Sequence, residues 1–185
     1  INSLVEAHAS EVWGVPLERQ PLQLHALTQR LVEEWEPILA NHQATLNHLI
    51  SAELPPLWVD PNQLWRVFEN LIANALKYNP PGVTITLSAE FIAVDSSESD
   101  NPENPQSKTE WMRCCVSDNG IGMTAEQCTD LFELYTRGTA TTRTIGLGLG
   151  LYLCRQIVTA HGGEIGVSSS PNSGATFWFT LPVFA

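Results

Sequence analysis

The sequence is poor in positive charge. It has 9 lysines and arginines against 20 aspartates and glutamates, which gives a net charge of −11. A protein that binds nucleic acid through the phosphate backbone needs a basic surface, so this balance argues against a nucleic-acid partner. An acidic chain that binds a polyanion must gather its few cations at one place or use a metal ion.

The sequence also lacks long apolar runs and a targeting segment. No stretch of about 18 apolar residues is present, so we expect no membrane-spanning helix and no direct membrane contact. The chain begins Ile1-Asn2-Ser3, without a start methionine or a signal peptide, and we interpret it as a piece of a longer protein. Membrane anchoring of that parent protein stays open, but we expect this part to be cytoplasmic.

Cysteines are few, and their spacing is typical of neither a zinc site nor a disulfide framework. The four are Cys114, Cys115, Cys128 and Cys154. Cys114 and Cys115 are adjacent in an expected strand, so their side chains should point to opposite faces of a sheet. We interpret the four as reduced thiols of a cytoplasmic protein, buried or half-buried.

Hydrophobic periodicity and turn residues predict a mixture of helices and antiparallel strands in one domain. Helices are expected at about residues 1–14 (the end of one), 22–42, 61–78, 125–132 and 148–160, and strands at about 44–50, 57–59, 83–94, 110–118, 164–169 and 175–181. This mixture predicts an α+β fold, a two-layer α/β sandwich in which helices cover one face of a mixed, mostly antiparallel sheet. The segment at about 95–110 has no apolar anchors, and we expect a flexible surface insert there, with a partner-binding role left open.

A first polar patch lies on the expected helix 61–78. Asn70, Asn74, Lys77 and Tyr78 follow helical spacing, so they share a face, while an apolar stripe on the opposite side supplies the core. Amide oxygens are ligands that suit Mg²⁺, and an ammonium group suits phosphate. The alternative for any one of these residues is an ordinary solvated helix face.

A second patch is the segment "SDNGIGM", residues 117–123. Asp118 is expected at a strand end, where a partly buried carboxylate can accept a hydrogen bond from an exocyclic amine such as that of adenine. Gly120 and Gly122 let the following turn pass close to a ligand. The alternative is a plain Asp-Asn-Gly turn, which is common.

A third patch, "TIGLGLGLYLC", carries Gly146, Gly148 and Gly150 just before and into an expected helix. Its G-x-G-x-G spacing follows a polar loop rather than a strand, so it does not fit a Rossmann dinucleotide fingerprint. No Gly-Lys-Ser/Thr follows, so it is not a P-loop either. What remains is a flexible segment that becomes a helix N-terminus, whose free N–H groups can receive phosphate oxygens.

Taken in order, these segments resemble a known set of motifs. "NLIANALKYNPPG", "DNGIGM", "LFELYTRG", "GLGLGLYLCRQIVTAHGG" and the closing "GATFWFTLP" are similar to the N, G1, F and G2 boxes and last strand of sensor histidine kinases, within the GHKL superfamily of Bergerat-fold ATP-binding domains. The resemblance covers roughly residues 20–182. It implies that 1–14 is the tail of a dimerisation helix, that 15–185 is an ATP-binding catalytic domain, and that about 136–147 is an ATP lid.

The resemblance also implies roles for single residues. Asn74 would be the Mg²⁺ ligand, with Asn70 beside it at the phosphates, while Lys77 would contact phosphate and Tyr78 would lie near the nucleoside. Asp118 would hydrogen-bond the adenine amino group. The implied catalytic residues are Asn70, Lys77 and Arg137, and the implied ATP-binding set is Asn70, Asn74, Lys77, Tyr78, Asp118, Gly120, Gly122, Met123, Arg137, Arg143, Gly146, Leu147, Gly148, Leu149, Gly150 and Thr176.

Within that set, Gly120 and Gly122 would make room for the base, and Thr176 would join the polar network around it. Arg137 would face the γ-phosphate, with Arg143 a further lid contact. The three glycines of the third patch would hinge the lid and present amides to the phosphates, while the leucines between them would seat the lid on the core.

One position separates the activities that the superfamily contains. Its ATP-hydrolysing members resemble one another in a helix glutamate, four residues before the metal-binding asparagine, that activates water. Here that position is Asn70, and the neighbouring Glu69 points about 100° away on a helix. An amide cannot deprotonate water, so we expect phosphoryl transfer to a protein rather than efficient hydrolysis. A GHKL-type ATPase, an anti-sigma-type serine kinase and a nucleotide-sensing module without activity are the alternatives.

A histidine kinase also needs a phosphoacceptor histidine. The chain has five histidines: His8, His25, His42, His48 and His161. None has the expected sequence context, so we interpret each as a structural or a surface residue. We therefore expect the acceptor upstream, on the parent's own dimerisation domain, and a response regulator as the downstream partner. The parent would be a homodimer, and this chain alone would bind Mg-ATP without labelling itself.

Overall fold

The computed structural model describes residues 16–94, 109–132 and 142–184. The expected helix end at 1–14, almost all of the insert at 95–110 and the first part of the expected lid therefore lie outside the described residues. The elements in chain order are β1 (Gln20–Leu22), α2 (Leu24–Asn41), β2 (Thr45–His48), β3 (Leu57–Val59), α3 (Pro61–Tyr78), β4 (Thr84–Val94), β5 (Thr109–Asp118), α4 (Ala125–Thr129), α5 (Thr142–Ala160), β6 (Ile165–Ser169) and β7 (Ala175–Pro182).

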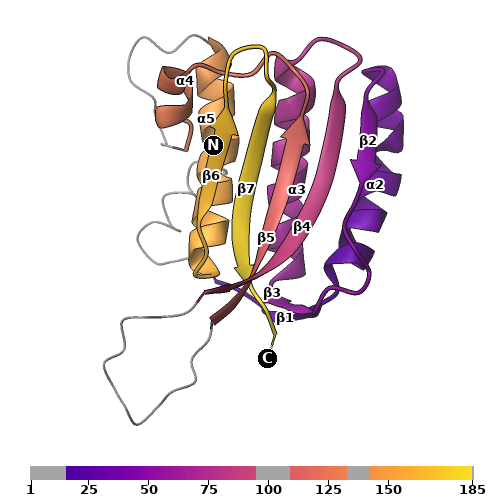
Figure 1. Ribbon diagram of the computed structural model, residues 1–185, viewed down its shortest axis with the longest axis vertical. Helices are drawn as coiled ribbons and strands as arrows, with labels where there is room; N and C mark the ends of the chain where they lie inside the picture. The colour runs from indigo at the N-terminus through magenta and orange to yellow at the C-terminus, as the bar shows by residue number, and fades with distance from the viewer. Residues whose placement is uncertain (1–15, 95–108, 133–141, 185) are drawn as a thin grey trace.

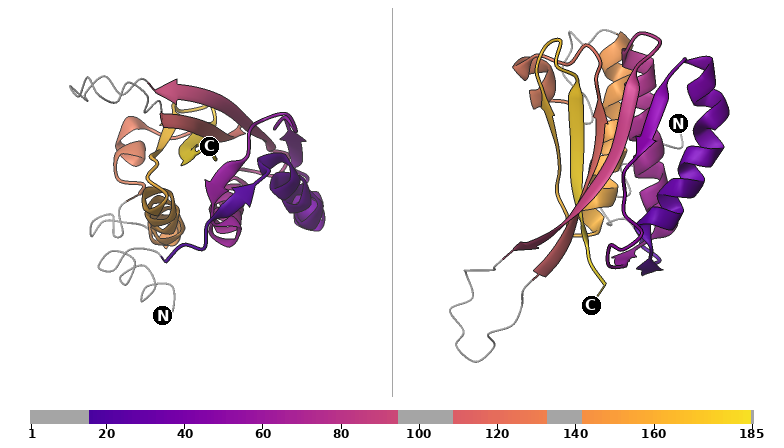
Figure 2. Two further views of the ribbon diagram at one scale, coloured as in Figure 1. Left: turned by 90° about the horizontal axis from the view of Figure 1, so that it is seen from below. Right: turned by 45° about the vertical axis from the view of Figure 1, so that its right-hand side comes forward.

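The main sheet has five strands in the order β2-β4-β5-β7-β6. β2 pairs parallel with β4, and the other three pairings are antiparallel. Helices α2, α3 and α5 cover one face of this sheet, while none of the described helices covers the other, which we call the open face (Figures 1 and 2). The predicted α+β two-layer sandwich with a mixed, mostly antiparallel sheet is confirmed.

The core lies between the sheet and the three long helices. Strand β7 alternates strictly, so that every second side chain points into the core and the others face the open side. Helix α3 buries a full apolar stripe, and Phe68 on α3 meets Phe179 on β7 edge to face with ring centroids 5.4 Å apart. Burying a side chain of this size stabilises the fold by about 1.5–3 kcal/mol, so this contact fixes α3 over the centre of the sheet.

Helix α3 has well-defined ends that the sequence predicted. Asp60 is the N-cap, and its carboxylate accepts hydrogen bonds from the N–H groups of Asn62 at 3.0 Å and Gln63 at 3.3 Å. Pro61 fills the first helical position, where no N–H is needed. The helix ends at Tyr78, and Asn79 is its C-cap. These bounds position the polar face of α3 relative to the strand ends.

The start of α2 and the end of α4 differ from the prediction. Leu22 belongs to β1, a three-residue strand that pairs antiparallel with β3, rather than to helix α2. Such a short strand offers too few positions for an alternating pattern to be visible in the sequence. Helix α4 ends at Thr129 rather than at 132, with Asp130 as its C-cap.

The predicted start of the last helix at about 148 was wrong, because α5 begins at Thr142. The prediction gave weight to the cost of glycine in a helix, about 1 kcal/mol per residue. At Gly150 helix α5 lies close to α3, where a methyl group would meet the Asn70 side-chain oxygen at 3.5 Å, an ordinary contact distance. The following Leu151 is fully buried, so the packing of α5 offsets the unfavourable propensity.

The cysteines follow the predicted pattern. Cys114 is buried in the core and Cys115 is half-buried on the open face of the sheet, and all four cysteines are free thiols. Burial raises the pKa of Cys114, and it raises the pKa of Cys154 to about 12, so both thiols stay protonated. None of the helices in the described part of the chain is long and apolar enough to cross a membrane.

Candidate nucleotide-binding site

Three of the predicted site segments meet at one end of the molecule. The C-terminal end of α3, the end of β5 with the turn that follows it, and the start of α5 lie together at the top of Figure 1. The turn after β5 is tied to α3 by a hydrogen bond from the Ile121 N–H to the Asn79 side-chain oxygen, at 3.0 Å. Helices α3 and α5 pack directly against each other. The structure therefore joins segments that are far apart in the sequence.

The two asparagines of the α3 face have different surroundings. Asn70 is half-buried and turned toward α5, where its amide hydrogen-bonds the Cys154 thiol. Asn74 is half-buried one turn later, and its amide nitrogen is buried without a hydrogen-bond partner among the described residues. Buried polar groups are normally paired. An unpaired one in a site is the condition expected where a ligand completes the bonding.

The cation of the α3 face is accessible. Lys77 is exposed, and its ammonium nitrogen lies 5.4 Å from the centroid of the Tyr78 ring. Tyr78 is half-buried and also engaged in a further interaction. A cation over a ring face is held only weakly at an exposed position, by about 0.5–1 kcal/mol, so Lys77 remains able to reach an anion.

Asp118 ends β5 with its carboxylate on the helix side of the sheet. Burial raises its pKa, and hydrogen bonds from the Gly120 N–H, the Ala175 N–H and the Asn79 side chain oppose that effect. The Gly120 N–H lies 2.9 Å from Oδ1. These donors fix the orientation of the carboxylate and leave it able to accept a further hydrogen bond.

The glycines of this turn are required by close approach. Gly122 has φ +69°, and a side chain there would overlap the carbonyl of Ser170, while one at Gly120 would overlap the Asn79 amide. Met123 follows and packs partly against the core, with its N–H donating to Ser169 Oγ at 2.9 Å. The prediction was that these glycines let the turn pass close to a ligand, and the close neighbours that the structure shows are Asn79 and Ser170 of the protein itself.

Thr176, predicted to join the polar network around the base, is not brought to Asp118 by the structure. Thr176 is paired with Ser117 across β5 and β7, and their hydroxyl oxygens lie 3.0 Å apart on the open face of the sheet. Asp118 is one residue later on β5, so its side chain points to the opposite face. The neighbouring residue on β7, Ala175, instead hydrogen-bonds the Asp118 carboxylate through its backbone N–H.

The lid residues are described only in part. Arg137 lies outside the described residues, and five others lie in the first turns of α5: Arg143, Gly146, Leu147, Gly148 and Leu149. Because α5 begins at Thr142, its N–H groups without an intrahelical partner are those of residues 142–144. The N–H groups of Gly146, Gly148 and Gly150 lie inside the helix in this structure, contrary to the prediction that they are presented to the phosphates.

Asn79 is the residue of this region that sequence reasoning missed. Its signal was weak: an asparagine directly after a helix and before Pro80 reads as a C-cap or a turn. In the structure its side chain contacts the helix, the glycine turn and Asp118. Contacts of this kind are not encoded in any local spacing.

The described histidines are held by structural hydrogen bonds. His25 Nδ1 donates to the Ile50 carbonyl at 2.7 Å, and His48 Nε2 donates to the Thr28 hydroxyl at 2.7 Å. His161 is 2% exposed and bonded through both ring nitrogens. His42 is exposed at the C-cap of α2, and His8 lies outside the described residues. These surroundings agree with the interpretation of the described histidines as structural or superficial.

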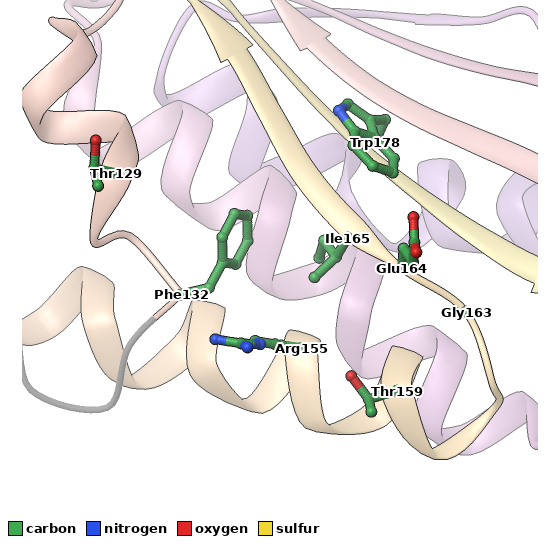
Figure 3. Close-up of a pocket in the computed structure, with 8 residues that line it drawn as sticks. All are labelled: Thr129, Phe132, Arg155, Thr159, Gly163, Glu164, Ile165 and Trp178. Carbon is green, nitrogen blue, oxygen red and sulfur yellow. The ribbon is translucent and has the colours of Figure 1, made fainter.

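A cavity of about 340 Å³ lies elsewhere, between α4, α5 and the edge strand β6 (Figure 3). Its lining includes Phe132, Arg155, Glu164 and Trp178, and none of the residues predicted to contact a nucleotide. Arg155 is already engaged in an interaction, so it is not a free cation for a ligand.

Comparison with known proteins identifies the family. Residues 59–185 match the family described as histidine kinase-, DNA gyrase B-, and HSP90-like ATPase. The chain is 30% identical over its full length to the adaptive-response sensory kinase SasA of Synechococcus elongatus, covering 44% of that protein, and 32% identical to SasA of Synechocystis over 89% of the chain and 39% of that protein. The chain thus spans less than half the length of these curated relatives.

Solved structures show the same fold. Full-length ShkA in complex with AMPPNP superimposes with a TM-score of 0.79 at 23% identity, over 100% of this chain and 35% of that one. The catalytic domain of the histidine kinase ThkA superimposes with a TM-score of 0.70 at 23% identity, over 90% of this chain and 96% of that one. Together with the matched motifs and their common location, these findings show that the chain belongs to the family of histidine kinase-, DNA gyrase B- and HSP90-like ATPases.

Proposed function

We propose that this chain is the ATP-binding catalytic domain of a two-component sensor histidine kinase. It binds Mg-ATP and transfers the γ-phosphoryl group to a histidine of a dimerisation domain that is not part of the chain. The observation that carries the proposal is the carboxylate of Asp118, held by three hydrogen bonds at the same end of the molecule as the polar face of α3.

Asp118 recognises the base. Its carboxylate is half-buried and oriented, and it accepts a hydrogen bond from the exocyclic amine of adenine. A half-buried acceptor discriminates strongly, because a base with a carbonyl at that position leaves the carboxylate unpaired and repelled. Gly120 and Gly122 let the turn pack closely on Asn79 and Ser170, and this packing holds the turn beside the proposed position of the base.

The polar face of α3 receives the phosphates. The proposed Mg²⁺ ligand is the side-chain oxygen of Asn74. Its amide nitrogen, which is buried and unpaired among the described residues, is a donor for a phosphate oxygen, and Lys77 supplies an exposed ammonium group. Bound Mg²⁺ would neutralise phosphate charge as the γ-phosphoryl group leaves. The proposed contact of Arg137 with the γ-phosphate rests on the resemblance of its motif alone.

The surroundings of Asn70 favour transfer over hydrolysis. The neighbouring thiol of Cys154, to which Asn70 is bonded, has a pKa of about 12 and stays protonated. Neither the amide nor this thiol is a base for water at neutral pH. Because no base at this position activates water, the γ-phosphoryl group is transferred to a nucleophile that another domain supplies.

The partners and location follow from this activity. We propose that the parent protein is a homodimer that passes the phosphoryl group from its own histidine to a response regulator. We place the domain in the cytoplasm, where ATP is available and where free thiols such as Cys115 remain reduced.

Calorimetric titration of the chain with Mg-ATP and Mg-ITP tests the proposal. Wild type should prefer ATP, and Asp118→Asn should weaken ATP binding by about 10- to 150-fold, since a hydrogen bond to a charged group contributes about 1.5–3 kcal/mol. Asp130→Asn, which removes an exposed carboxylate at the end of α4, is the matched control and should bind ATP as wild type does. Wild type that binds no Mg-ATP, or equal affinities in wild type and Asp118→Asn, would contradict the proposal.

A further inference from the structure

Asn79 is the first residue beyond helix α3, and it stands in extended backbone with φ −114° and ψ 151°. It is half-buried, in contrast to the exposed Pro80 that follows. This conformation turns its side chain back over the last turn of α3 instead of outward into solvent. Its nitrogen Nδ2 donates to the Ala75 carbonyl at 2.8 Å, which fixes the amide to the helix end.

The same amide contacts the turn after β5 at two places. Its oxygen Oδ1 accepts the Ile121 N–H at 3.0 Å, and the amide hydrogen-bonds the Asp118 carboxylate. Because Oδ1 is used by an N–H donor, the nitrogen is the atom that serves both Ala75 and Asp118. Asparagine has two such donors and one acceptor oxygen, so one side chain can make these three bonds together.

The contact is tight on both sides of the turn. A side chain at Gly120 would overlap the Asn79 amide, so the turn lies directly on it. On its other side the turn is held by backbone groups, with the Gly174 N–H donating to the Gly120 carbonyl at 3.1 Å and the Asn172 N–H to the Ile121 carbonyl at 2.6 Å. One side of the turn is therefore held by the side chain of Asn79, and the other side is held by backbone N–H groups.

Asn79 is the side-chain donor to Asp118, so it is the donor that a substitution can remove. The other two are the backbone N–H groups of Gly120 and Ala175, and no charged side chain contributes to the shift of the Asp118 pKa in the described part of the chain. A donor favours the ionised carboxylate, and burial disfavours it. The Asn79 amide thus acts on both the orientation and the charge of Asp118.

We propose that Asn79 is a positioning residue of the nucleotide site, whose amide ties the carboxylate of Asp118 to the end of helix α3 and so sets the selectivity for the base. It does not touch the nucleotide. It links the helix that carries Asn74 and Lys77 to the carboxylate that reads the base, so both parts of the site move as one unit. This inference rests on the proposed function.

The test compares the same isosteric change at two asparagines near Asp118: Asn79, at the end of α3, and Asn119, the residue that follows Asp118. Asn79→Asp keeps the acceptor for the Ile121 N–H, removes both donors and places a second carboxylate beside Asp118. Asn119→Asp makes the same chemical change at an exposed residue whose oxygen accepts the Thr84 N–H at 2.8 Å. Asn79→Ala removes the donors without adding charge, and serves if Asn79→Asp does not fold.

Two readouts separate positioning from mere stability. NMR titration of the nucleotide-free chain should show that the Asp118 carboxyl titrates at least about one pH unit higher in Asn79→Asp than in wild type. In Asn79→Ala the titration should also move to higher pH, but by less. The ratio of ATP to ITP affinity at pH 7 should fall about tenfold in both Asn79 variants. Asn119→Asp should change that ratio less than twofold.

The outcome that overturns the inference is specific. If the Asn79 variants lower the melting temperature but keep the wild-type Asp118 titration and ATP:ITP ratio, Asn79 is a helix cap and nothing more. If wild type binds neither nucleotide, the proposed function fails instead. In that case the Asp118 titration still shows whether Asn79 controls the carboxylate.

Discussion

His161 shows at the scale of one residue how burial and hydrogen bonding fix a charge state. The Asp60 N–H donates to its Nε2 at 3.0 Å, so Nδ1 carries the proton and donates to the Ile157 carbonyl at 2.8 Å. The ring is neutral and joins the end of α5 to the start of α3. Beside it, the Arg19 guanidinium donates to the Ala160 carbonyl at 2.9 Å, so the segment before β1 is tied to the same place.

Replacing this histidine should change how stability depends on pH. Burial lowers the pKa of His161 below its ordinary value of 6.5, with the Arg19 guanidinium adding to that effect against the Ile157 and Asp60 contacts. As pH falls, the His161 ring therefore gains a proton in the unfolded chain before it does so in the folded chain. The contribution of this ring to the folding stability is full above about pH 6.5 and is lost as pH falls below that value. His161→Gln keeps an acceptor for the Asp60 N–H but does not titrate.

We expect His161→Gln to cost about 1–3 kcal/mol at pH 7.5, because the buried contacts are remade imperfectly. Between pH 7.5 and 5.5, however, urea unfolding should show a smaller loss of stability in the variant than in wild type. An equal or larger loss in the variant would mean that the ring is protonated in the folded protein.

What the sequence could predict at single residues depended on local signals. Asp118 was found because a carboxylate at a strand end before two glycines has a recognisable spacing. Asn79 was missed because its partners, Asp118 and Ile121, are about forty positions away along the chain. The separation of Thr176 from Asp118 was not predictable, because the pairing of β7 with β5 decides which side chains share a face, and the sequence does not state that pairing.

At the scale of elements, α5 is where propensity and packing disagree. Its first nine residues include Gly146, Gly148 and Gly150, yet they are helical from Thr142. The glycine pattern suggested a loop, and the helix is favoured by packing against α3 that only the fold reveals. Strands β4, β5 and β7 and helix α3 were predictable because alternation, a helical stripe and the Asp60-Pro61 start are all local.

Gly150→Ala tests whether these glycines serve the nucleotide. The new methyl group would meet the Asn70 oxygen at 3.5 Å, an ordinary contact, so the variant should fold. Alanine should stabilise α5 by about 0.5–1 kcal/mol in urea unfolding. If the start of α5 must rearrange around phosphates, the affinity for Mg-ATP should fall at the same time.

Thr159→Ala is the control for that trade-off, since Thr159 is exposed near the other end of α5. It should improve helix propensity and leave ATP affinity unchanged. Unchanged affinity in Gly150→Ala as well would show that this glycine does not serve the nucleotide.

At the scale of the whole molecule, charge is the dominant feature. A net charge of −11 repels the phosphates of ATP, so binding depends on local cations and on the metal. On α3 the polar face offers the Lys77 ammonium and the amide of Asn74. Bound Mg²⁺ would therefore reduce the repulsion between this acidic chain and the phosphates of ATP.

Metal removal should expose this dependence. With EDTA in place of Mg²⁺, we expect wild-type affinity for ATP to fall at least about tenfold, equivalent to about 1.4 kcal/mol. Asn74→Ala should bind ATP weakly with or without Mg²⁺, whereas Asn62→Ala, an exposed asparagine at the start of α3, should keep the wild-type response. An unchanged magnesium effect in Asn74→Ala would remove Asn74 from the metal site.

The central claim concerns where the γ-phosphoryl group of ATP goes. The most direct measurement incubates the full-length parent protein with ATP labelled at the γ-phosphate and follows the label on the protein and in solution. The account predicts label on the protein that acid removes and base does not, as expected of phosphohistidine. Label released as free phosphate, with none retained on the protein at any time, would make this an ATPase despite Asn70 and contradict the account.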